Sequence, residues 1–128
     1  MKVLICGNTS ELPVRKLLDI FPGVWTVLSV SPEELYTHIG DADVLIPEHT
    51  MVDESTLARA ENLKLIQTGP GYENVPLYYC RDMGIYVANA PGINSAAVAE
   101  QVRGLVICWL GFGNTGREVA RKCAELSV

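Results

Sequence analysis

The chain lacks any long apolar run and any concentration of positive charge. No apolar run approaches the roughly 18 residues that a membrane-spanning helix needs, so we expect no membrane partner. The apolar residues 3–6 are too few, and too soon followed by Gly7, to form a signal peptide. The 10 Lys and Arg residues are dispersed among 15 Asp and Glu residues. They form no basic stripe that could bind the phosphate backbone of a nucleic acid, so we also expect no nucleic-acid partner.

Pairs of metal-ligating side chains are also missing from the sequence. The cysteines form no C-x-x-C pair, and neither His38 nor His49 has a second His or Cys at ligand spacing, so no metal site is expected. One cysteine lies in an apolar run, which favours buried free thiols in a reducing cytosol over disulfides. We therefore expect a cytoplasmic protein whose four thiols are free: Cys6, Cys80, Cys108 and Cys123.

Short apolar runs alternate with helix-like patterns along the chain, which is 48% apolar and 20% charged, as folded globular domains are. Five runs typical of buried parallel strands occupy residues 3–6, 25–30, 42–46, 63–67 and 85–88. This alternation at short connections predicts an α/β fold with a flavodoxin-like, doubly wound parallel sheet. We place this first domain at residues 1–104.

Two residues mark helix boundaries within the predicted domain. Asp53 is expected to cap a helix that reaches about Asn62, because a side-chain oxygen at that position accepts from free N–H groups. Gly84 is expected to end a helix over residues 75–83, since glycine readily adopts the left-handed conformation of a helix stop.

A glycine-rich segment near the end of the chain matches the G-x-G-x-x-G dinucleotide fingerprint. The apolar residues Leu105–Leu110 predict a strand, and a helical pattern follows over Arg117–Leu126. Strand, glycine turn and helix together would place free N–H groups against a pyrophosphate. The candidate cofactor-binding residues are Gly111, Gly113, Asn114, Thr115 and Gly116.

The alternative interpretation of this segment is a bare strand-to-helix turn. We assign residues 105–128 to a partial NAD-binding Rossmann unit. We expect it to pack onto the first domain, with Leu105–Leu110 joining or abutting the sheet as a sixth strand.

Several motifs in order resemble the D-isomer-specific 2-hydroxyacid dehydrogenases, such as phosphoglycerate dehydrogenase and glyoxylate/hydroxypyruvate reductase. They are GDADVLI at residues 40–46, LKLIQTGPGYENV at 63–75, GIYVANAPG at 84–92 and NSAAVAE at 94–100. The resemblance implies a flavodoxin-like substrate lobe, a Rossmann cofactor lobe and a homodimer. It also implies an oxidoreductase that moves hydride between NAD and a small 2-hydroxy or 2-keto acid.

The resemblance also implies a substrate-binding loop, whose backbone amides would hold the substrate carboxylate. Pro70 has no N–H, so Gly71 and Tyr72 would have to donate. The alternative is an ordinary turn after a strand. Glu73 and Asn74 are interpreted as fixing the loop by local hydrogen bonds of the Asx type. The candidate substrate-binding residues are Gly69, Pro70, Gly71 and Tyr72.

The chain departs from the family pattern in two places. A segment of some tens of residues that the family has between Glu100 and Gly111 is missing here. The acidic residue that contacts the ribose, and the catalytic arginine, glutamate and histidine, would lie beyond Val128. No catalytic residue is therefore assigned, and NAD is expected with NADP not excluded.

We consequently expect a fragment that is inactive alone, with two alternatives: an inactive α/β binding or interaction module, or a remnant joined by a deletion. His49, which follows a predicted strand, could act as a base, but a solvated loop residue is the favoured interpretation.

Overall fold

The structure is a computed structural model that describes residues 1–7, 11–20, 23, 25–111 and 113–125. The chain divides into two compact units, Met1–Pro91 and Gly92–Val128. This division precedes the predicted boundary between residues 104 and 105, because one helix runs through that boundary.

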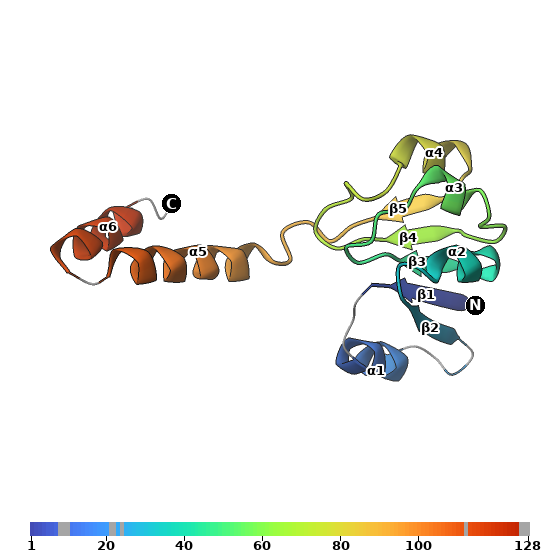
Figure 1. Ribbon diagram of the computed structural model, residues 1–128, viewed down its shortest axis with the longest axis horizontal. Helices are drawn as coiled ribbons and strands as arrows, with labels where there is room; N and C mark the ends of the chain where they lie inside the picture. Colours follow the sequence, from blue (N-terminus) through green and yellow to red (C-terminus); the bar gives the residue numbers. More distant parts are fainter. Residues whose placement is uncertain (8–10, 21–22, 24, 112, 126–128) are drawn as a thin grey trace. The chain divides into compact units, whose positions relative to one another are not determined.

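The first unit is built on a five-stranded parallel sheet (Figure 1). Its strand order, β2-β1-β3-β4-β5, is the flavodoxin-like order, so the predicted fold class is confirmed. Each strand coincides with a predicted apolar run to within a few residues. The strands are β1 (Lys2–Cys6), β2 (Thr26–Val30), β3 (Val44–Ile46), β4 (Leu65–Gln67) and β5 (Tyr86–Ala88).

The connections between the strands are short helices. Asp53 caps one of them as predicted, since its Oδ1 accepts from the backbone N–H of Thr56 at 2.8 Å. That helix ends at Leu57 rather than near Asn62, because the N–H groups of Arg59 and Ala60 turn back to carbonyls three residues earlier. The helices of this unit are α1 (Glu11–Ile20), α2 (Leu35–His38), the 3-10 turn η1 (Ile39–Asp41), α3 (Glu54–Leu57) and α4 (Leu77–Asp82).

Gly84 ends α4 in a Schellman motif, as the sequence predicted. Its φ is +72°, and its N–H bonds the Arg81 carbonyl at 3.1 Å. The next N–H, of Ile85, bonds the Cys80 carbonyl at 2.8 Å. Both Cys80 and Ile85 are buried, so the motif also supplies the apolar contact that accompanies this helix ending.

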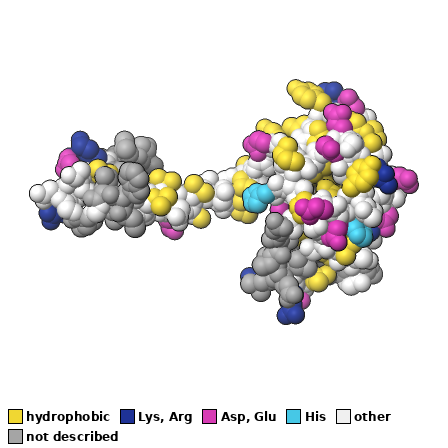
Figure 2. All heavy atoms as spheres, in the orientation of Figure 1, with side chains coloured by type: hydrophobic (Ala, Val, Ile, Leu, Met, Phe, Trp, Pro, Cys, Tyr) yellow, Lys and Arg dark blue, Asp and Glu magenta, His cyan; other side chains and the backbone are white. Residues whose placement is uncertain are grey.

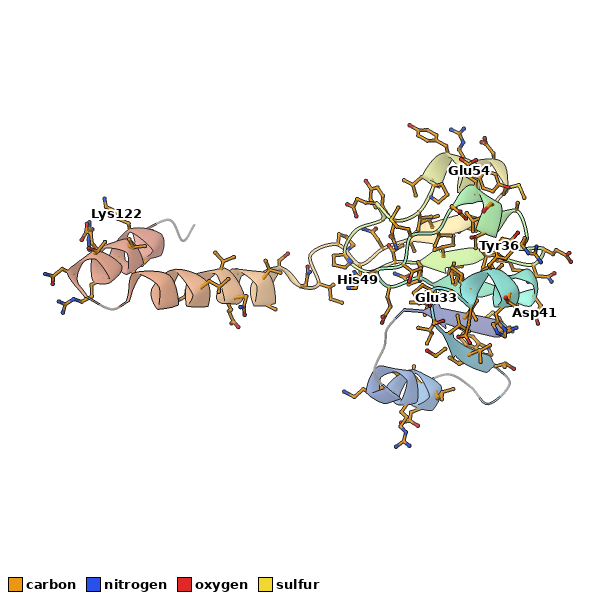
Figure 3. The ribbon with its side chains drawn as sticks, in the orientation of Figure 1. Glu33, Tyr36, Asp41, His49, Glu54 and Lys122 are labelled. Atoms are coloured by element: carbon orange, nitrogen blue, oxygen red, sulfur yellow. The ribbon has the colours of Figure 1, made fainter. Side chains whose placement is uncertain are left out.

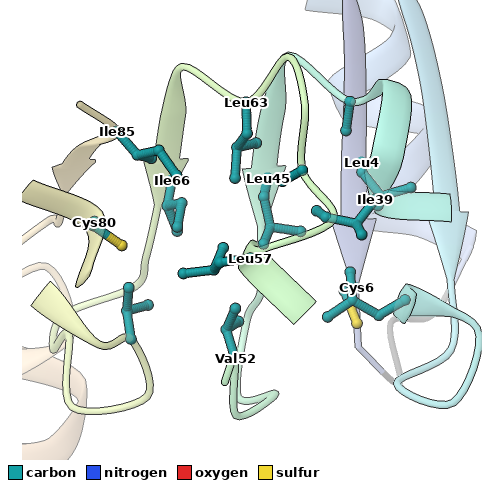
Figure 4. Close-up of a cluster of buried hydrophobic side chains, with 14 of the residues drawn as sticks. Leu4, Cys6, Ile39, Leu45, Val52, Leu57, Leu63, Ile66, Cys80 and Ile85 are labelled. Atoms are coloured by element: carbon teal, nitrogen blue, oxygen red, sulfur yellow. The ribbon is translucent and has the colours of Figure 1, made fainter. Parts of the chain in front are cut away.

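Both faces of β1 are buried, which explains its uninterrupted apolar sequence. Leu4 and Cys6 belong to one cluster with Leu45 of β3 and Ile66 of β4 (Figure 4). Val3 and Ile5, which point to the opposite face, are each only 1% exposed. The cluster is closed by residues of the connecting helices: Leu35, Ile39, Leu57 and Cys80.

Cys6 and Cys80 are free and buried, so the expected buried thiols are confirmed at these two positions. The side chains of the other two cysteines lie outside the described residues.

The second unit corrects the sequence prediction for Leu105–Leu110. These residues are not a strand but the second half of one helix, α5 (Ser95–Leu110), which is followed by α6 (Asn114–Glu125). The predicted sixth strand is therefore wrong, and the glycine segment joins two helices. An apolar run of six residues fits either structure by periodicity. Here the run extends a helix already begun, and each residue added contributes one further backbone hydrogen bond.

Candidate functional site

The loops that could hold a ligand follow the carboxyl ends of β1, β3 and β4. In open parallel sheets, ligands bind outside these ends, at the point where the strand order reverses. Here the chain moves from β1 to β2 on one side and to β3 on the other, so the reversal lies between β1 and β3. The predicted substrate loop, Gly69–Tyr72, follows β4 at the same edge.

Asn74 fastens the loop after β4 to the loop after β3. Its side-chain Nδ2 donates to the backbone carbonyl of Thr50 at 2.8 Å and to that of Glu48 at 3.3 Å. The backbone carbonyl of Asn74 accepts from the Val52 N–H at 2.9 Å. The sequence interpretation of Asn74 as a loop-fixing residue holds, but the bonds reach across two loops rather than closing a local Asx turn. The sequence indicated this contact only indirectly, because the two loops follow neighbouring strands of the sheet.

The predicted substrate loop has its carbonyls engaged and its donors free. The carbonyls of Gly69 and Pro70 accept from Ala90 N–H and from Asn89 Nδ2, at 2.9 and 2.8 Å. No hydrogen bond among the described residues uses the N–H groups of Gly71 or Tyr72. A loop whose carbonyls are hydrogen-bonded while its N–H groups remain free is suited to bind an anion.

One carboxylate already lies beside this loop. A Cβ placed on Gly71 would clash with Oε2 of Glu73, so the Glu73 side chain occupies the space in front of the Gly71 Cα. A ligand carboxylate at the loop would consequently share it with Glu73.

A cavity of about 470 Å³ opens at the reversal between β1 and β3. The Glu48 carboxylate lies over Gly7, since a Cβ at Gly7 would meet Glu48 Oε2 at 2.7 Å. Glu48 itself has a φ of +28°, an uncommon conformation for a residue other than glycine. The residues lining the cavity are Gly7, Pro32, Glu48, His49, Thr50 and Met51.

Cys6 lies at the end of β1, next to this cavity's loops. Its Sγ is 3.6 Å from Thr50 Oγ1 and 3.7 Å from the Ser31 carbonyl. Burial raises the pKa of the Cys6 thiol, and the negative charges of Glu33 and Glu48 raise it further. The thiol is therefore neutral and unreactive, a packing residue rather than a nucleophile.

Charged side chains are distributed unevenly between the two ends of the sheet. Lys2 pairs with Asp41, and Lys64 Nζ lies 2.9 Å from Asp43 Oδ1, all at the amino ends of the strands. Hydrogen bonds from the Lys2 backbone N–H and the Lys64 ammonium hold the pKa of Asp43 below its usual range. His49 lies at the opposite, carboxyl end (Figure 3).

Among the described residues, neither His38 nor His49 forms the ion pair with a carboxylate that would orient it as an acid–base group. The ion pairs among the described residues include neither His38 nor His49. Within the same residues, no group of three His, Cys, Asp or Glu side chains is arranged to hold a metal ion. His49 is exposed, as expected of a solvated loop residue.

The predicted cofactor residues lie in the second unit, at the junction of α5 and α6. Gly111 has a φ of +61°, so this turn requires glycine. Helix α6 begins at Asn114, and the N–H of Arg117 bonds the Gly113 carbonyl at 3.0 Å. The junction retains the glycine turn and the helix start of the fingerprint but not the strand before them.

No helix within the described ranges combines the length and apolarity needed to cross a bilayer.

Comparison with protein families gives a match over residues 3–125 to the model described as D-isomer specific 2-hydroxyacid dehydrogenase, catalytic domain. The chain is 34% identical over 109 residues to a D-3-phosphoglycerate dehydrogenase of Methanocaldococcus jannaschii, covering 84% of this chain and 21% of that protein. It is 38% identical over 112 residues to a putative 2-hydroxyacid dehydrogenase of Haemophilus influenzae, covering 83% and 35%. The chain thus spans between a fifth and about a third of these relatives.

Two solved structures share the fold over nearly the whole chain. The TT0316 protein of Thermus thermophilus superposes with a TM-score of 0.75 at 25% identity, over 95% of this chain and 40% of that one. The PH0520 protein of Pyrococcus horikoshii gives a TM-score of 0.64 at 29% identity, over 98% and 38%.

Proposed function

Since the chain belongs to the D-isomer specific 2-hydroxyacid dehydrogenase family, we propose that it supplies the substrate-binding part of an NAD-dependent oxidoreductase. The substrate is a small 2-hydroxy acid, or the 2-keto acid formed from it by hydride transfer. The chain alone binds without turnover, because no acid–base histidine paired with a carboxylate is present among its described residues.

The observation that supports the substrate class is the donor-only loop Gly69–Tyr72. Its free N–H groups, on Gly71 and Tyr72, are fixed in position because the neighbouring carbonyls are hydrogen-bonded. Fixed backbone donors suit the carboxylate that every 2-hydroxy and 2-keto acid carries. Pro70 contributes no donor.

The cofactor part of the proposal concerns the turn between α5 and α6. Gly111, Gly113, Asn114, Thr115 and Gly116 would contact the pyrophosphate of NAD, with the free N–H groups at the start of α6 directed at it. Because α5 precedes the turn where a strand was predicted, only the phosphate contacts are supported. Titration with NAD tests this part, and a dissociation constant below about 100 µM, some 5.5 kcal/mol, would support it.

The loop is tested by following the backbone amide signals of the 15N-labelled chain during titration with pyruvate. We expect the Gly71 and Tyr72 signals to move with pyruvate and to stay in place with pyruvamide, which has the same shape without the carboxylate charge. The Glu73→Gln variant should bind pyruvate several-fold more tightly, since a competing negative charge is removed. Equal responses to the acid and the amide would overturn the proposal.

A homodimer is the assembly that we propose. Val98, Val102 and Leu105 recur at the spacing of one helix face on α5 and are 51%, 54% and 54% exposed. A second copy of the chain would cover this stripe. The same stripe favours the alternative function, an inactive interaction module, if the loop fails to bind acids.

A further inference from the structure

The cavity between the ends of β1 and β3 is separate from the donor-only loop but belongs to the same edge of the sheet. Adjacent strands are about 4.8 Å apart, so β4 lies roughly 10 Å from β1, two strand spacings away. A ligand whose carboxylate rests on the loop after β4 would extend its other end along this edge toward the cavity. The Asn74 bonds fix the distance between the two positions.

The polar character of the cavity comes from one carboxylate. Glu48 is half-buried, and its side chain makes no ion pair among the described residues. The absence of a side chain at Gly7 is what allows its carboxylate to lie over the end of β1. Asn74 donates to the Glu48 carbonyl, so the backbone that carries this side chain is held in place.

No positive charge balances this carboxylate at the strand ends. The segments that follow the strands, residues 31–34, 47–53, 68–75 and 89–91, contain no Lys or Arg and carry Glu33, Glu34, Glu48, Asp53 and Glu73. The Lys2 and Lys64 side chains are paired with acids at the amino ends instead. Figure 2 shows Asp and Glu side chains spread over the surface of this unit.

We propose that this cavity receives the distal end of the substrate, and that Glu48 selects a distal group that is cationic or donates hydrogen bonds. A distal phosphate or carboxylate is disfavoured, because it would face an unpaired carboxylate in a partly dehydrated cavity. This inference rests on the proposed function, since it deepens the specificity of the same edge. It separates this chain from relatives whose names specify phosphorylated substrates, such as phosphoglycerate and erythronate 4-phosphate.

Three five-carbon 2-keto acids that differ only in their distal group test the proposal on the chain itself. The probes are 5-guanidino-2-oxopentanoate, 2-oxopentanoate and 2-oxoglutarate, titrated into the labelled chain. We expect the guanidino acid to bind about tenfold more tightly than the neutral acid, and 2-oxoglutarate to bind more weakly than either. The amide signals of Glu48 and His49 should move with the guanidino acid.

Glu48→Gln removes the charge and keeps the shape of the side chain. In this variant the preference for the guanidino acid should fall to within about threefold, while binding of 2-oxopentanoate stays unchanged. Glu61→Gln, the same change before β4 at the amino end of the sheet, is the matched control and should keep the full preference. Thermal unfolding of all three proteins verifies that they are folded.

The outcomes separate this inference from the proposed function. If the three acids move the Gly71 and Tyr72 signals with equal affinity, or if Glu48→Gln keeps the tenfold preference, the assignment of Glu48 is wrong and the carboxylate loop stands. Butylguanidine, which has no carboxylate, should move only the cavity signals. If it does so while no acid moves the loop signals, the proposed function fails, and with it the assignment of the cavity to the distal end of the substrate. No response to any probe overturns both.

Discussion

Replacing Asn74 by alanine should loosen the edge of the sheet where the candidate site lies. The substitution removes two donors, leaving the carbonyls of Thr50 and Glu48 without their 2.8 and 3.3 Å bonds. A net intramolecular hydrogen bond contributes about 1 kcal/mol, and an unpaired half-buried carbonyl costs about as much again. The longer bond counts for less, since it exceeds the usual 2.7–3.2 Å range. We therefore expect a loss of about 1–2 kcal/mol in the free energy of unfolding.

Asn74→Asp provides a sharper version of the same test. A carboxylate donates nothing at neutral pH and would place negative charge against two carbonyl oxygens, so its loss should exceed that of Asn74→Ala. Protonation returns one donor, and the difference between the two variants should therefore shrink as the pH falls. Asn62→Ala, at an exposed position before β4, is the control and should stay within about 0.5 kcal/mol of the parent.

Urea unfolding followed by circular dichroism measures these free energies, and hydrogen exchange gives a local measurement. The Val52 N–H, which bonds the Asn74 carbonyl at 2.9 Å, should exchange faster in Asn74→Ala than in the parent. An unfolding free energy within 0.3 kcal/mol of the parent, about the error of such measurements, would refute the reasoning. It would mean that the two loops hold their positions without Asn74.

Four further predictions concern residues outside the site. Gly84→Ala should destabilise the first unit by about 1–2 kcal/mol in urea unfolding, because its φ of +72° is strained for any side chain. Gly104→Ala should instead raise helicity by circular dichroism and stabilise α5 by up to about 1 kcal/mol. Its added Cβ meets nothing within 4 Å, and unchanged helicity would contradict a continuous α5. The low pKa of Asp43 contributes stability above the unfolded pKa, about 3.9 for Asp, which is lost as the pH falls through the folded pKa. The free energy of unfolding of Asp43→Asn should therefore fall less steeply than that of the parent as the pH is lowered. Parallel curves of unfolding free energy against pH would count against this. Val102→Glu should shift the sedimentation of the chain from dimer to monomer, and a monomeric parent would disprove the proposed assembly.

Local sequence signals predicted most of the secondary structure of the first unit. Gly84 stopped its helix and Asp53 capped its own because both act on backbone groups within a few residues of themselves. The continuous apolar run of β1 predicted a strand buried on both faces, since the burial of a parallel strand is visible in its composition. The family resemblance was likewise contained in the order of the motifs, and the match over residues 3–125 confirms it.

The sequence by itself therefore determined the parallel α/β sheet, the capping residue of one helix, the stop of another and the family, all of which depend on short-range pattern. Tertiary structure alone decided three other features. It placed Leu105–Leu110 in a helix, whereas the periodicity of a six-residue apolar run fits a strand equally well. It brought Asn74 to the carbonyls of Glu48 and Thr50, and it placed the Glu48 carboxylate over Gly7. Both contacts join residues more than 20 positions apart, and no spacing in the sequence encodes such a distance.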